Sequence, residues 1–138
     1  MKLPLRYILT MAIVVLVGCK TTPKIEKDNI YGVWSTIEFE SNVSGLSESM
    51  IANGKAMALK ADFDIRKDGS YTVEYEGGSR EEYTWKWNDR GNGIISTSTD
   101  PNMAWDDNYT IVLLEDSTLV WSISSSMGGH TRTMERIK

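Results

Sequence analysis

Apolar side chains recur at every second residue through most of the chain after residue 29, and this period of two constrains the fold more than any other feature. The clearest run covers residues 57–65, where Met, Leu, Ala, Phe and Ile occupy alternate positions and mostly polar residues lie between them. Such alternation is typical of a strand that is buried on one face. An Asp-Gly pair, which favours a tight hairpin, follows at 68–69. The sequence therefore predicts an antiparallel β protein.

The same pattern predicts eight strands, most of them joined by short turns. They cover residues 31–39, 57–65, 71–76, 83–87, 94–98, 109–114, 118–124 and 130–137. Eight strands are enough to close a barrel, which removes every exposed sheet edge. We therefore expect an all-β fold, an antiparallel eight-stranded up-and-down barrel, with a β-sandwich of similar strand count as the alternative. The polar segment 41–55 is long for a hairpin link, and we expect a loop or helix there, folded over one mouth of the barrel.

The first 18 residues differ from the rest. Lys2 and Arg6 precede an apolar run over residues 7–17, which is the organisation of a secretory signal peptide and too short to cross a membrane. The run ends in Leu16-Val17-Gly18-Cys19, which resembles the lipobox of bacterial lipoproteins, and Cys19 is the only cysteine of the chain. The resemblance implies a diacylglyceryl group on the Cys19 thiol, cleavage before this residue and often a further acyl chain, such as palmitate, on its amine. A plain signal peptide with an incidental cysteine is the alternative.

We divide the chain into a lipoprotein signal peptide (1–18), the lipidated cysteine with a flexible tether (19–28) and a β-barrel domain (29–138). The segment after Cys19 is polar and aperiodic, as expected of a tether. Lys20 follows the cysteine, whereas the sorting pattern of enteric bacterial lipoproteins places Asp there for retention in the inner membrane. We therefore expect a lipid-anchored protein of the cell envelope, at the outer membrane.

The charge of the chain excludes one class of partner. There are 15 Lys and Arg against 19 Asp and Glu, and the leader carries two of the basic residues and none of the acidic ones. Cleavage therefore makes the net charge more negative than −4. An acidic surface disfavours nucleic acid and anionic lipid headgroups. We expect no nucleic-acid partner, and we expect the lipid anchor to make the contact with the membrane.

A short motif connects the strand pattern to a known family. Gly32-Val33-Trp34 lies at the head of the first expected strand, and this Gly-x-Trp resembles the signature of lipocalins and of the lipocalin-like domains of bacterial lipoproteins. Later hairpins and the last strand of that family are similar to residues 63–71, 114–119 and 134–137. The resemblance covers most of residues 29–138 and implies an eight-stranded up-and-down barrel that binds a small ligand.

The resemblance also implies structural roles for three residues at the closed end of the barrel. In the family, the tryptophan plugs this end and an arginine from the last strand lies across its indole. Trp34 is the corresponding plug here, Gly32 lets the chain pass close to the ring, and Arg136 is the arginine, with Arg132 as the alternative.

Aromatic residues are the candidate ligand contacts, because five tryptophans are many for a chain of this size. An aromatic-lined lumen would hold a small apolar or amphipathic molecule. The alternative is that these rings only fill the core, and that the protein contacts an envelope protein through its loops. The candidate ligand-binding residues are Phe63, Tyr83, Trp85, Trp121 and, in the polar loop 100–108, Trp105.

The sequence shows no catalytic or metal-binding constellation. His130 is the only histidine, and no Gly-x-Ser-x-Gly motif is present. The loop 100–108 has Asp and Asn at intervals but lacks the Gly and Glu that an EF-hand requires. We therefore expect a protein that is not an enzyme and that has no metal site and no cofactor.

Overall fold

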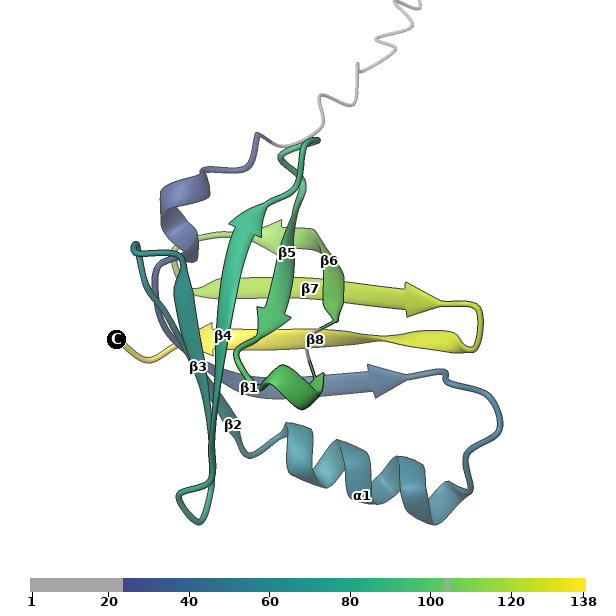
Figure 1. Cartoon of the computed structure of the whole chain (residues 1–138). Helices are drawn as coiled ribbons and strands as arrows, with labels where there is room; N and C mark the ends of the chain where they lie inside the picture. Colours follow the sequence, from purple (N-terminus) through teal and green to yellow (C-terminus); the bar gives the residue numbers. More distant parts are fainter. Residues whose placement is uncertain (1–23, 104) are drawn as a thin grey trace, which may run out of the picture.

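The chain folds into one closed barrel of eight antiparallel strands, with a short α-helix between the first two (Figure 1). The computed structural model describes residues 24–103 and 105–138. The elements are η1 (Lys27–Ile30), β1 (Gly32–Ser41), α1 (Glu48–Ala58), β2 (Ala61–Ile65), β3 (Ser70–Tyr75), β4 (Arg80–Trp87), β5 (Gly93–Ser98), η2 (Pro101–Met103), β6 (Asp106–Leu114), β7 (Thr118–Ser125) and β8 (Gly128–Arg136). Each strand pairs with the next, and β8 pairs with β1. The expected up-and-down barrel is confirmed, and the sandwich alternative is wrong because all eight strands belong to a single closed sheet.

The inward-pointing side chains of all eight strands meet in one core. Alternation along a strand sends every second side chain into the barrel, where it packs against residues from the neighbouring strands. The large hydrophobic residues with almost no exposed surface are Trp34, Trp121, Ile30, Ile65, Ile94, Leu119 and Met134. A barrel of eight strands is narrow enough for its own side chains to fill it, and around these residues it is filled.

Two β-bulges interrupt the alternation. In β1 the register to β8 shifts between Thr36 and Glu38, and in β6 the register to β7 shifts between Ile111 and Leu113. A bulge adds one residue to a strand and reverses which later positions point inward. As a result the extra residue Ile37 is 55% exposed, whereas Phe39 returns to the inner face opposite Arg132.

The helix α1 corrects the predicted strand 57–65. The first two apolar residues of that run, Met57 and Leu59, are exposed, and the strand begins only at Ala61. The segment before it is rich in alanine, a strong helix former, and Ser47 caps the helix by accepting a hydrogen bond from the Met50 N–H. The helix expected within 41–55 is therefore present but extends to Ala58. Ala58 is its only buried residue, so α1 covers little of the barrel mouth.

The described N-terminal segment joins the barrel at the end opposite to α1 (Figure 1). Ile25 packs against the core, and η1 begins at Lys27, so the last residues of the segment expected to be a tether belong to the folded domain. The signal peptide 1–18, Cys19 and the start of the tether lie outside the described residues. Within the described part of the chain, no helix is long and apolar enough to cross a membrane.

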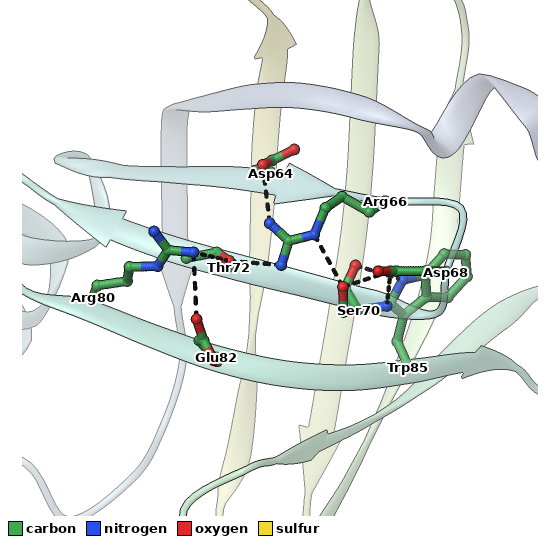
Figure 2. Close-up of polar contacts among 8 residues, drawn as sticks. All are labelled: Asp64, Arg66, Asp68, Ser70, Thr72, Arg80, Glu82 and Trp85. Atoms are coloured by element: carbon green, nitrogen blue, oxygen red, sulfur yellow. Dashed lines mark hydrogen bonds and ion pairs between the residues drawn. The ribbon is translucent and has the colours of Figure 1, made fainter.

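The outer face of β2, β3 and β4 carries a polar network (Figure 2). Arg66 and Arg80 both donate hydrogen bonds to the hydroxyl of Thr72, and they cover it so well that this outward-pointing side chain is buried. Each arginine also pairs with a carboxylate, Arg66 with Asp64 at 3.1 Å and Arg80 with Glu82 at 3.3 Å. All three guanidinium nitrogens of Arg66 are bonded within the chain, and Arg80 is paired through Nη2, so the network stabilises the sheet and each of the two charges has a carboxylate partner.

Candidate functional site

One end of the barrel is closed by Trp34. Its side chain has no exposed surface, and its Nε1–H donates a hydrogen bond to the carbonyl of Ile30 in η1 at 2.8 Å. The guanidinium of Arg136 lies over the indole, 4.3 Å from the ring centre. Arg136 is also saturated with acceptors, since it donates to three backbone carbonyls, those of Asn29, Tyr31 and Asp116. The closed end is thus a structural plug.

Gly32 is required where the chain passes this plug. Its φ of +137° lies in a region that side chains with a Cβ rarely adopt. A Cβ built on it would also overlap the guanidinium of Arg136 and the carbonyl of Lys138. The structure therefore brings together Gly32, Trp34 and Arg136 at one place, and the alternative arginine, Arg132, lies elsewhere.

The opposite end of the barrel is less tightly filled. It is formed by the ends of β1, β3, β5 and β7 and by the starts of the strands between them. Six aromatic or basic residues that point inward and are only half-buried surround it, and we call them the mouth cluster: Phe39, Tyr75, Tyr83, Tyr109, His130 and Arg132. Two hollows of about 420 and 300 Å³ open at the rim, one beside His130 and one beside Tyr83.

Arg132 lies at the floor of this mouth. Its Nη1 donates to the hydroxyl of Thr36 at 2.8 Å and to the carbonyl of Ala58 at 3.1 Å, which fixes the last turn of α1 to the barrel. A cation is favourable there because the last carbonyls of a helix lack partners within the helix. The guanidinium carbon lies 4.8 Å from the ring centre of Phe63 and 5.2 Å from that of Phe39. Burial lowers the pKa of Arg132, but a guanidinium stays charged at any physiological pH.

The tyrosines of the mouth remain protonated at neutral pH. Burial raises the pKa of Tyr109 to about 12, with a further contribution from the nearby Asp107. Burial also raises the pKa of Tyr83 and of Tyr75, whose hydroxyls donate to Glu81 at 2.7 and 3.4 Å. For His130, burial and the charge of Arg132 lower the pKa. The mouth therefore presents tyrosine hydroxyls, one fixed positive charge and, at its rim, the carboxylates of Glu81 and Asp107.

The candidate ligand residues separate into three groups. Phe63 and Trp121 lie below Arg132, with their ring centres 5.3 Å apart, and Tyr83 joins the mouth cluster. Trp85 points into the barrel near the closed end, where its Nε1–H donates to the carbonyl of Ser70. Trp105 is 56% exposed in the loop before β6 and does not enter the barrel. The structure thus places Phe63 and Trp121 beside Arg132 and Tyr83 at the rim of the same mouth, and it separates the other two.

Sequence reasoning missed Arg132 and Tyr109 as site residues. Both alternate with outward residues on their strands, so the period of two places them inside. The useful signal was a charged residue at an inward position of a strand, because a buried charge needs a partner or a function. Within the described part of the chain, no group of three or more His, Cys, Asp or Glu residues is arranged to hold a metal ion.

Fold and site together define a small closed β-barrel that is plugged at one end and has an aromatic, cationic mouth at the other. No family model matches the chain, and no curated protein matches it in sequence. Among solved structures, it is similar to a DUF4847 family protein from Bacteroides vulgatus, with 12% sequence identity and a TM-score of 0.48. The alignment covers 81% of this chain and 96% of that protein. We base no functional conclusion on a likeness of this size.

Proposed function

We propose that this protein is a non-enzymatic, lipid-anchored binding module of the cell envelope, which holds a small amphipathic molecule in the mouth of its barrel. The observation that carries the proposal is the contrast between the two ends. Near the plug Trp34 is fully buried and the indole N–H groups of Trp34 and Trp85 donate to carbonyls, whereas at the mouth the six residues of the mouth cluster are half-buried and include the charged Arg132. Aromatic walls with a few convergent polar groups are the usual composition of a small-molecule site.

The ligand lies in the upper half of the barrel in this proposal, and not deep in a lumen. Phe63 and Trp121 pack against each other and against the core, so they form the floor of the site. The rings of Phe39, Tyr83 and Tyr109 supply its walls. A site of this depth suits a molecule of one or two rings, or a short acyl chain, better than a long lipid.

The described chain enters the barrel through η1 at the plugged end, opposite to the mouth (Figure 1). We therefore expect a lipid on Cys19 to leave the mouth directed away from the membrane. We expect labelled palmitate to be incorporated into the wild-type chain in a bacterial host and not into Cys19→Ala, because the thiol is the lipid acceptor. Thr21→Ala, two residues away, is the matched control and should be labelled normally. Labelling of the Cys19→Ala chain would contradict the proposed anchor.

Filling the mouth should abolish binding. Ser98 is the cross-strand partner of Tyr83 and points inward, whereas Thr110 is exposed on the outer face of β6. We expect the full chain in phospholipid nanodiscs to bind 2-naphthamide or 2-naphthoate in calorimetric titrations. Ser98→Phe should lose this binding, because the new ring occupies the mouth, and Thr110→Phe should retain it. Absence of binding of both probes to the wild type, or equal binding to the two variants, would contradict the proposal.

A second function, contact with an envelope protein or polymer, is favoured by one observation. The loop between β5 and β6 leaves Met103 and Trp105 41% and 56% exposed at the mouth end of the barrel. Large exposed apolar side chains often mark interaction surfaces. This function predicts that Trp105→Ala impairs association in the envelope without changing the binding of either naphthyl probe.

A further inference from the structure

We infer that the ligand carries a single carboxylate, bound by Arg132 at the floor of the mouth, and that its body is apolar or aromatic. The inference rests on the proposed function and specifies the class of molecule. It follows from three features: hydrogen-bond donors without acceptors, a positive charge without a counter-charge, and aromatic walls around both.

Several hydrogen-bond donors at the floor have no acceptor. Arg132 uses only Nη1, so Nε and Nη2 make no hydrogen bond with any described residue, and neither is sealed from solvent. Trp121 is the cross-strand partner of Arg132, and its Nε1–H is fully buried with no acceptor among the described residues. The ring of Tyr109 lies 4.9 Å from that of Trp121, and its hydroxyl makes no hydrogen bond within the described chain either. A buried donor left without an acceptor is costly, which here applies to the Trp121 Nε1–H. Together with the free N–H groups of Arg132 and the hydroxyl of Tyr109, it favours a ligand that brings acceptors.

The charge of Arg132 is not neutralised by the chain. Among the described residues it forms no ion pair, although Arg66 and Arg80 on the outer face each pair with a carboxylate, and Arg136 is saturated by carbonyls. A guanidinium with Nε and Nη2 free offers two parallel N–H groups, the geometry that binds both oxygens of a carboxylate. The aromatic rings of Phe39 and Phe63 lower the local polarity and strengthen such a pair.

Two acidic residues limit how much negative charge the ligand can carry. Asp107 and Glu81 lie at the rim, where Tyr109 is close to the first and Tyr75 and Tyr83 donate to the second. Neither carboxylate pairs with Arg132, so both remain sources of negative potential above the floor. They would repel a second negative charge on the ligand. The guanidinium of Arg132 at the floor and the carboxylates of Asp107 and Glu81 at the rim therefore favour a ligand with one negative charge, a monocarboxylate, over a dianion such as a phosphate monoester.

The test compares two probes of equal size that differ in charge. 2-Naphthoate and 2-naphthamide are titrated calorimetrically into the full chain in nanodiscs, with empty nanodiscs as the blank. We expect the acid to bind the wild type at least about tenfold more tightly than the amide, since hydrogen bonds to charged groups commonly contribute that much. In Arg132→Gln the ratio of the affinity for the acid to the affinity for the amide should fall to about one. Arg132→Lys keeps the charge but loses the paired donors, and it should give an intermediate ratio. Arg66→Gln removes an outer arginine that is paired with Asp64 and follows the plug end of β2, so it should leave the ratio unchanged.

The ratio of the two affinities distinguishes a direct contact with the carboxylate from an effect of the substitution on folding. Arg132 also connects Thr36 to Ala58, so its loss will weaken the fold and lower the affinity for both probes, but only a carboxylate contact changes their ratio. Equal binding of acid and amide to the wild type would overturn the inference and leave the proposed function intact. A preference for the acid that persists in Arg132→Gln would overturn the assignment to Arg132. Absence of binding of both probes would overturn the proposed function and the inference with it. If Arg132→Gln does not fold, the ratios of the wild type and Arg132→Lys are compared. A lower ratio in Arg132→Lys supports the assignment to Arg132, and an equal ratio overturns it.

Discussion

Trp34→Ala is expected to lower the free energy of unfolding by about 3–5 kcal/mol, the usual cost of removing a fully buried aromatic side chain. The indole has no exposed surface and donates a hydrogen bond to the Ile30 carbonyl. Its face is also covered by the guanidinium of Arg136, a contact worth about 0.5–2 kcal/mol. Alanine would leave a cavity at the plug and remove both contacts. Urea unfolding monitored by circular dichroism measures the loss.

Trp105→Ala is the matched control for this prediction. The same side chain is removed, but from an exposed position in the loop before β6, so a change within about 0.5 kcal/mol is expected. If Trp34→Ala cost no more than Trp105→Ala, the plug would not stabilise the barrel, and the contrast between a closed end and a mouth would lose its basis.

Gly32→Val is the second substitution for which we expect a large loss, about 2–4 kcal/mol of unfolding free energy. Two causes add. The φ of +137° is strained for a β-branched residue, and the new side chain would overlap the Arg136 guanidinium and the Lys138 carbonyl. Because Arg136 would have to leave the indole, the plug would be damaged from its outer side. The same unfolding assay measures this loss.

Gly54→Ala provides a control of opposite sign. Gly54 is exposed within α1, and a Cβ on it would meet no other atom within 4 Å. Alanine there should raise the stability by about 0.5–1 kcal/mol, because it favours the helix over the unfolded chain.

A stable Gly32→Val protein would show that the chain can pass the plug in another conformation.

The barrel could be predicted from sequence because its pattern is local. The alternation within a strand such as 71–76 indicates which of its residues point inward. A turn pair such as Asp68-Gly69 indicates where one strand ends and the next begins. The prediction was wrong where two patterns coincide. Met57 and Leu59 continue the alternation of β2, but they lie on a capped helix and the link to β2, and both are exposed. The bulge at Ile37 could not be predicted from the pattern either, because it is defined by the pairing of β1 with β8, almost a hundred residues away.

The site was harder to predict than the fold. Phe63 and Trp85 carry the same signal in the sequence, an aromatic residue on an inward face, yet one lies below the mouth and the other near the plug. Their depth depends on the register between strands, which no single strand reveals. Arg132 was assigned only as a second choice for the plug, although it is two residues before Met134 on the inner face of β8.

What the sequence by itself determined is the period of two, the number of strands and the inner face of most of them. These properties depend on neighbours along the chain. Only the tertiary structure decided that Arg132 and Tyr109 both lie next to Trp121, and that no carboxylate of the described chain pairs with the charge there. The reason is physical. Closing the sheet places β6, β7 and β8 side by side at a particular stagger, and that stagger sets which inward side chains meet at the same height in the barrel.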